Sequence, residues 1–123
     1  MTEKEIENAI LTYLNLRPDC FAFKVNTVGV FDSVKKVYRK SNNKFAVNGV
    51  SDIIAQFDGL GTVFIEVKTP KGRQSDAQKA FENSINRYNG NYFIARGLDD
   101  IKKIILDLQE SREDDICWLF HLY

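Results

Sequence analysis

Two apolar segments joined by a short turn limit the folds open to this chain more than any other part of its sequence. Residues 50–57 and residues 62–68 are rich in β-branched and aromatic side chains, which favour strands. The sequence between them, Asp-Gly-Leu-Gly at residues 58–61, is typical of a hairpin turn. We therefore predict that the two segments pair as antiparallel strands. The second segment is apolar on both faces, which is typical of a strand packed between two layers.

The spacing of the apolar residues predicts the other elements. A period of three to four residues indicates helices, and alternation or short apolar runs indicate strands. In chain order, the predicted elements are a helix capped by Thr2 and ended by Arg17-Pro18-Asp19, a strand over residues 21–26, a basic excursion over residues 28–47 with a hairpin around residues 41–43, the strand pair, a helix capped by Ser75, a strand over residues 92–95, a helix over residues 98–108 and a last strand over residues 116–122. This order predicts an α/β fold with a mixed sheet flanked by helices.

The length and the termini bound the organisation of the chain. Its 123 residues are too few for two stable cores, so we expect a single domain over residues 1–123. The charged start, residues 1–5, is unlike a signal peptide, and no apolar run is long enough to span a membrane. We therefore expect a cytoplasmic protein. In that compartment Cys20 and Cys117 are expected to be reduced, buried thiols, and His121 is expected to pack in the last strand rather than bind a metal.

The net charge is zero, but the charges are unevenly distributed. Residues 24–44 carry six lysines and arginines against one aspartate, a second basic group follows in residues 68–79, and acids gather in residues 107–115. Local potential, rather than net charge, decides where a polyanion binds. The residues expected to contact DNA phosphates are Lys35, Lys36, Arg39, Lys40, Lys71 and Arg73. A subunit interface is the alternative role for the first four, and chance clustering of surface charge is the alternative for all six.

An acid and a lysine lie two residues apart in the second strand of the predicted hairpin. Glu66 and Lys68 leave the same face of that strand, and counting back from the turn places Asp52 near Glu66. Two converging carboxylates repel each other, and a bound Mg²⁺ or Mn²⁺ resolves that repulsion. Such a cation polarises a phosphate and lowers the pKa of bound water, while Lys68 would orient that water or stabilise developing charge. The set suits phosphodiester hydrolysis. The alternative is an exposed Glu–Lys pair and an aspartate that caps a turn.

At these residues the sequence resembles the PD-(D/E)XK nuclease superfamily, with Asp52 as the aspartate and Glu66-Val67-Lys68 as the (D/E)XK element. It is similar in particular to the VRR-NUC domain, the virus-type replication-repair nuclease, over essentially the whole chain. The motifs that carry the resemblance are Gly49–Ile54, Glu66–Ser75, Gln78-x-x-Phe81, Gly90–Arg96 and Leu98–Asp100. The resemblance implies a restriction-endonuclease-like core and a Mg²⁺-dependent endonuclease in which Mn²⁺ can substitute.

The resemblance also implies further residues of the active site. A glutamate on the first helix would face the metal; we expect this to be Glu3, with Glu7 as its rival. Gln78 would hydrogen-bond the phosphate or the attacking water, and the backbone carbonyl of Val67 would be a further metal ligand. Apart from the resemblance, the two glutamates would be expected to be solvated helix acids and Gln78 an exposed helix residue.

Stand-alone members of this family are similar to Holliday-junction resolvases, which are homodimers that cut four-way junctions in DNA recombination and repair. The resemblance therefore implies a phage or bacterial resolvase. A single site on so small a domain cannot make two symmetric nicks, which favours a two-fold dimer. The aromatic-rich residues 116–123 are candidate dimer contacts, or else simply close the sheet. The alternatives are a flap, single-strand or restriction-like nuclease of the same fold, and a catalytically silent DNA-binding module.

Overall fold

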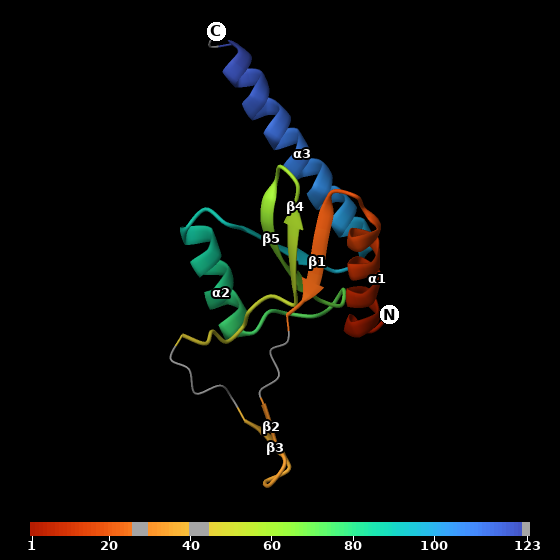
Figure 1. The fold of residues 1–123 in the computed structure, drawn as a ribbon, viewed down its shortest axis with the longest axis vertical. Helices are drawn as coiled ribbons and strands as arrows, with labels where there is room; N and C mark the ends of the chain where they lie inside the picture. Colours follow the sequence, from red (N-terminus) through yellow and green to blue (C-terminus); the bar gives the residue numbers. More distant parts are fainter. Residues whose placement is uncertain (26–29, 40–44, 122–123) are drawn as a thin grey trace.

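The computed structural model describes residues 1–25, 30–39 and 45–121 of the chain. Helices and strands follow one another in a single α/β arrangement (Figure 1). In chain order the elements are α1 (Glu3–Leu16), β1 (Cys20–Lys24), β2 (Val30–Asp32), β3 (Val37–Arg39), β4 (Ile53–Phe57), β5 (Gly61–Val67), α2 (Asp76–Arg87), β6 (Asn91–Ala95) and α3 (Leu98–His121). Among the described residues, no helix is both long and apolar enough to cross a membrane.

The central sheet has four strands in the order β1-β4-β5-β6. The first three strands are antiparallel neighbours, whereas β6 runs parallel to β5, so the sheet is mixed, as predicted. The predicted hairpin is β4–β5, and its turn uses Gly59 and Gly61, whose φ angles are +77° and +84°. Glycine adopts this left-handed backbone conformation without the steric cost that a Cβ imposes, and this explains why the Asp-Gly-Leu-Gly sequence marks the turn.

The two faces of the sheet are covered by different helices. Apolar residues of α1 and α3, among them Ile10 and Ile101, pack with alternate residues of the strands into the main core, which contains Ile53, Val63 and Ile65. The other face is covered by α2, but only over β5 and β6. There the ring of Phe81 meets Phe64 and Tyr92, with centroids 5.6 Å and 6.0 Å away. The part of this second face formed by β1 and β4 is left without a helix.

Hydrogen bonds from side chains fix α1 at both ends. The Thr2 hydroxyl accepts from the Glu5 N–H at the start of the helix, which confirms the predicted cap. Near its end, the Asn15 amide donates to the Ala22 carbonyl and accepts from the Ala22 N–H, both at 2.9 Å. Ala22 lies on the outer strand β1, so Asn15 occupies backbone groups that would otherwise be open to another strand.

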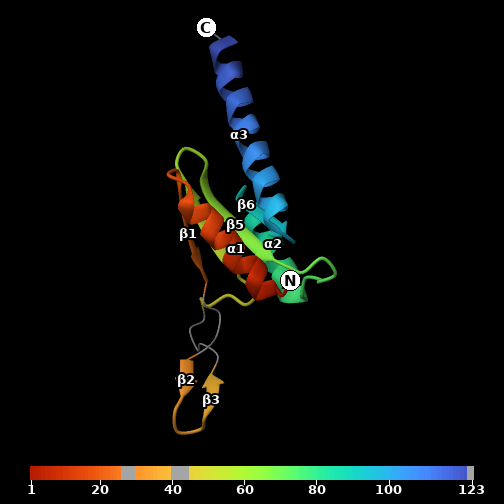
Figure 2. The ribbon, with the colours of Figure 1, turned by 90° about the vertical axis from the view of Figure 1, so that its right-hand side faces the viewer.

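The prediction of a last strand over residues 116–122 is wrong for residues 116–121, which are helical; residue 122 lies outside the described residues. Residues 98–121 form one continuous helix, α3, which in both views extends well past the sheet (Figures 1 and 2). The predicted helix end at residue 108 has no physical basis in the sequence, since no glycine or proline occurs from residue 98 to residue 121. The expected packing of Cys117 and His121 concerns side chains that lie outside the described part of the structure.

The basic excursion contains a short hairpin, β2–β3, that pairs Val30 with Arg39 and lies beyond one end of the sheet (Figures 1 and 2). Its turn comprises residues 33–36, with Lys36 at φ +53°. The turn therefore comes earlier than the position predicted around residues 41–43, and those residues lie outside the described ones. Each strand of this hairpin has only three residues. Alternation over so few side chains is too short to locate the strands or the turn from the sequence.

Candidate active site

Strand pairing brings Asp52 and Glu66 together at one end of the sheet. Ile53 pairs with Ile65 across β4 and β5, so the preceding Asp52 lies opposite Glu66. The Val67 N–H donates to the Asp52 carboxylate at 2.7 Å, and the Asp52 carbonyl accepts from the Val25 N–H at 2.8 Å. Asp52 is therefore held by β5 through its side chain and by the end of β1 through its backbone.

Glu66 is a buried carboxylate with an incomplete set of partners. Its side chain is 0% exposed, and its Oε1 accepts from the Gln78 amide at 2.8 Å and lies 4.0 Å from the Lys68 ammonium. Among the described residues, no donor group hydrogen-bonds the other oxygen, Oε2. Burial, followed by hydrogen bonding to and repulsion from the Asp52 carboxylate, raises the pKa of Glu66 to about 8, although the charge of Lys68 acts in the opposite direction. Without a cation, the carboxyl is therefore largely protonated at neutral pH.

Gln78 connects Glu66 to the start of α2. The Ser75 hydroxyl accepts from the Gln78 N–H, and the Gln78 side-chain oxygen accepts from the Ser75 N–H at 2.8 Å, which forms a capping box. Because the amide oxygen is occupied by this cap, the amide nitrogen is left to donate to Glu66. Gly49 (φ +78°) packs against the backbone of Ala77 and Gln78, where a Cβ would clash. The first turn of α2 is therefore fixed against both the Gly49 loop and Glu66.

The two candidate acids of α1 differ in their surroundings. Glu3 is exposed, and its charge is the smallest of the causes that raise the pKa of Glu66, after burial and Asp52. Glu7 is buried, and its Oε1 lies 3.1 Å from the ammonium of Lys24 on β1. The choice of Glu3 as the helix acid of the site therefore stays a prediction, whereas Glu7 is engaged in an ion pair that its position on the helix does not reveal.

The candidate DNA-contacting residues lie in two segments near the same end of the sheet. Lys35 and Lys36 are exposed in the β2–β3 turn, and Lys71 and Arg73 are exposed in the loop between β5 and α2. In Figure 1 both segments lie at the end of the sheet where β1 finishes and β4 begins. The two remaining candidates are not placed: the side chain of Arg39 and the whole of Lys40 lie outside the described residues.

Arg96 organises the loop that carries Lys71 and Arg73, and sequence reasoning assigned it no role. Its guanidinium donates to the carbonyls of Thr69 and Gly72 at 2.8 Å and 2.7 Å. The sequence feature that points to this role is its position immediately after β6. Because β6 runs parallel to β5, the two strands end at the same edge of the sheet, so a cation after β6 lies near the loop that follows β5. Arg96 therefore holds the loop next to the Asp52–Glu66 pair.

The donor atoms of this end of the sheet fit a divalent cation. No cluster of three or more His, Cys, Asp or Glu residues occurs in the described ranges, so the candidate site contains two carboxylates, Asp52 and Glu66. The unpartnered Oε2 of Glu66 is the feature that a cation would satisfy, since a buried carboxylate oxygen without a partner is costly. Hard oxygen donors with room for water are suited to Mg²⁺ or Mn²⁺.

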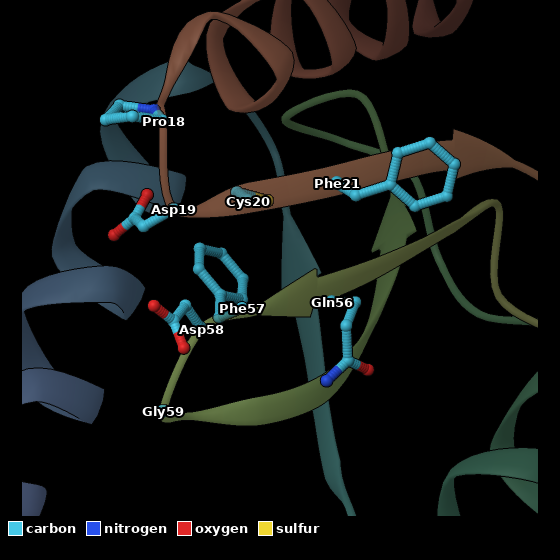
Figure 3. Close-up of a pocket in the computed structure, with 8 residues that line it drawn as sticks. All are labelled: Pro18, Asp19, Cys20, Phe21, Gln56, Phe57, Asp58 and Gly59. Atoms are coloured by element: carbon cyan, nitrogen blue, oxygen red, sulfur yellow. The ribbon is translucent and has the colours of Figure 1, made fainter.

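A hollow of about 490 Å³ lies at the opposite end of the sheet. Figure 3 shows Asp19 and Asp58 pointing into the space beside α3, with Phe57 between them. Two acids at its rim do not suit a polyanion. Burial raises the pKa of the Cys20 thiol in its lining to about 11, so this cysteine is protonated at neutral pH and is a poor nucleophile. Cys20 is a free thiol, as predicted, although it is only partly buried.

Comparison of the chain with known protein families, curated proteins and solved structures found no match. The protein is an α/β domain with a mixed four-stranded sheet flanked by helices. One end of that sheet carries the cluster Asp52, Glu66, Lys68 and Gln78. A function has to be inferred from the chemistry of these four residues.

Proposed function

We propose that this protein is a Mg²⁺-dependent endonuclease that hydrolyses phosphodiester bonds in DNA, a VRR-NUC member of the PD-(D/E)XK superfamily. The observation that carries the proposal is the juxtaposition of Asp52 with a fully buried Glu66, one oxygen of which has no partner among the described residues. A buried carboxyl with a pKa raised to about 8 is costly to ionise unless a cation is bound. Lys68 beside it supplies the positive group that phosphoryl chemistry uses.

The side chains divide the chemistry between them. The carboxylates of Asp52 and Glu66 would hold the cation, together with the backbone carbonyl of Val67. When bound, Mg²⁺ supplies charge that polarises the phosphate and lowers the pKa of a water ligand. Lys68, 4.0 Å from Glu66, would orient the attacking water and stabilise the charge that develops on phosphate. Gln78 holds Glu66 in place through its amide nitrogen and would reach the phosphate or the water only by exchanging that bond.

The preferred substrate in this proposal is a four-way DNA junction, cut by a homodimer in the cytoplasm of a bacterial or phage-infected cell. The exposed Lys35 and Lys36 support a large DNA ligand, because their hairpin lies beyond the sheet at the active-site end (Figure 1). A symmetric junction needs two nicks, and one chain offers one Asp52–Glu66 site, so a two-fold dimer is the economical assembly.

Cleavage of a labelled panel of DNA structures tests this function. A four-way junction, a flap, a single strand and a linear duplex are incubated with the purified chain in Mg²⁺, in Mn²⁺ and in EDTA. We expect metal-dependent cutting, strongest on the junction, and a dimer in sedimentation at micromolar concentration. Preferential cutting of another DNA structure, or a monomer that nicks junctions one strand at a time, would support the nuclease activity but contradict the proposed resolvase function. DNA binding without cleavage in either metal would indicate a silent DNA-binding module.

A further inference from the structure

Two phenylalanines lie exposed side by side on the outer strand β1. Phe21 is 65% exposed and Phe23 is 42% exposed, and their ring centroids are 5.7 Å apart. Rings this close contact each other, so they form one continuous apolar ledge and not a slot. Neighbouring aromatic rings on the edge of a sheet are a liability for aggregation, and their exposure therefore calls for a function.

This aromatic ledge, Phe21 and Phe23, lies on the same face of the sheet as Glu66. Phe23 pairs with Ile54, and Ile54 pairs with Phe64, so the three side chains share a face. Phe64 and Glu66 are two residues apart on β5, and both are contacted by α2, through Phe81 and Gln78 respectively. This is the face that α2 leaves uncovered over β1 and β4.

The distance from the aromatic ledge to the active site is short. Phe23 is opposite Ile54, which is two residues from Asp52 along the chain. With about 3.3 Å per residue along a strand and about 4.8 Å between strands, the Cα atoms of Phe23 and Asp52 lie about 8 Å apart. Phe21 continues the ledge away from the site as far as the acidic hollow, which it helps to line. Its ring lies along β1, directed away from Asp19 and Asp58 (Figure 3). A chain of nucleotides with one phosphate at Asp52 is therefore long enough to reach both rings.

The backbone beside the ledge excludes a further strand at this edge of the sheet. The outward N–H and carbonyl of Ala22, between the two phenylalanines, are both bonded to Asn15, which prevents another strand from adding to this edge. Beyond Phe21 the same face continues with exposed, mutually hydrogen-bonded Gln56 and Thr62. The two exposed rings are therefore bordered by polar groups on the Phe21 side and by the partly buried Ile54 beside Phe23. This narrow apolar strip suits a thin ligand better than the apolar core of a protein interface.

We infer that Phe21 and Phe23 stack against unpaired bases of the DNA strand whose phosphate lies at the Asp52–Glu66 site. The inference rests on the proposed nuclease function and specifies its substrate: the strand must be unpaired next to the cut. Every base offers a π face, and stacking on aromatic side chains binds single strands without regard to sequence. A continuous duplex hides those faces, so the aromatic ledge selects single-stranded DNA and branched DNA in which bases next to the cut unpair, as at a flap or at the branch point of a four-way junction.

Binding in EDTA tests the inference separately from cleavage. The affinities of the wild type and of Phe21→Ala/Phe23→Ala are measured by anisotropy for a labelled oligodeoxythymidine of about ten nucleotides and for a blunt duplex. We expect the preference for the single strand to fall about tenfold or more. Tyr88→Ala is the control, because Tyr88 is an aromatic residue at the end of α2 that is more exposed (81%) than either phenylalanine, and its loss should leave that preference unchanged.

A tryptophan variant supplies a direct readout of stacking. Phe23→Trp should retain the preference, and its added fluorescence should be quenched by the oligonucleotide, beyond any change at Trp118 in the wild type. An unchanged preference in the double alanine variant, or a change in its oligomeric state in place of DNA binding, would overturn the inference. Cleavage in Mg²⁺ is scored independently: a chain that stacks bases but never cuts contradicts the proposed function, whereas one that cuts without the ledge contradicts only the stacking.

Discussion

The two ends of the central sheet each place two carboxylates on neighbouring strands, and the two pairs lie in opposite environments. At one end Glu66 is fully buried beside Asp52, and burial is the main cause that raises its pKa to about 8. At the other end Asp19 and Asp58 line an open hollow (Figure 3), and the hydrogen bond from Arg17 lowers the pKa of Asp19. Proximity of acids is common to both ends. Burial without a full set of partners is what makes one pair a candidate metal site.

Mutation of one carboxylate at each end should give the largest contrast. Glu66→Gln or Asp52→Asn removes one of the two proposed metal ligands, so Mg²⁺-dependent cleavage should fall by at least about a hundredfold, the scale of a lost electrostatic group in an active site. Asp58→Asn, at the exposed end, should cleave at the wild-type rate. Initial rates on the preferred DNA substrate measure both. Near-normal turnover in either active-site variant would show that the Asp52–Glu66 pair does not hold the catalytic metal.

Lys68 should affect the chemical step and not the metal. Its ammonium is 4.0 Å from Glu66 and is itself mostly buried, so in the proposed mechanism Lys68→Ala removes the positive group that would face the reacting phosphate. The turnover number at saturating Mg²⁺ should fall by about a hundredfold, while the metal concentration at half-maximal rate changes little. The opposite pattern, weak metal binding with normal turnover at saturation, would make Lys68 a support for the ligands.

The metal-free protein should lose stability as the pH rises, because of Glu66. Its pKa of about 8 in the folded chain lies above the ordinary value of 4.5, so between these values the folded chain keeps a proton that the unfolded chain has released. The free energy of unfolding should therefore fall from about pH 4.5 to about pH 8, by up to about 1.4 kcal/mol per pH unit, and level off above. The pKa of Asp19 is lowered in the folded chain, so its effect on the free energy of unfolding is opposite: its stabilising contribution is lost as the pH falls.

Urea unfolding in EDTA across this pH range measures the effect. In Glu66→Gln the decline should be much smaller, and the variant should be more stable than the wild type at pH 8. In Asp58→Asn the decline should persist. Parallel profiles for the wild type and Glu66→Gln would mean that the buried carboxyl does not titrate in this range.

The elements that were predicted correctly are those whose signals are local. The β4–β5 pair follows from the glycine turn and from strand parity, and the same parity places Asp52 opposite Glu66. The caps at Thr2 and Ser75 also depend on residues three apart. Such features need no knowledge of the rest of the molecule.

The features that the sequence analysis missed depend on contacts between residues far apart in the sequence, or on whether a segment has a strand to pair with. The ion pair of Glu7 with Lys24 and the bonds from Asn15 to Ala22 join α1 to β1, and nothing in the spacing within α1 predicts them. The apolar run of residues 116–120 was assigned to a strand, but it follows a helix without a breaking residue, and in both views that helix extends past the sheet (Figures 1 and 2). A strand needs a neighbour, whereas a helix satisfies its own backbone.

The smallest expected effect is on the salt dependence of DNA binding, and it is tested by a comparison of two pairs of exposed lysines. Lys35 and Lys36 are adjacent and exposed in the β2–β3 turn at the active-site end, whereas Lys102 and Lys103 are an adjacent, exposed pair on α3. If the first pair neutralises phosphates, Lys35→Ala/Lys36→Ala should reduce the slope of log affinity against log salt by about two units, since each phosphate contact releases about one counterion. Lys102→Ala/Lys103→Ala removes the same charge and should leave the slope unchanged. Titrations of a four-way junction at several salt concentrations in EDTA give both slopes. Equal slopes in the two variants, with a loss of dimer only in the first, would assign the hairpin to the subunit interface.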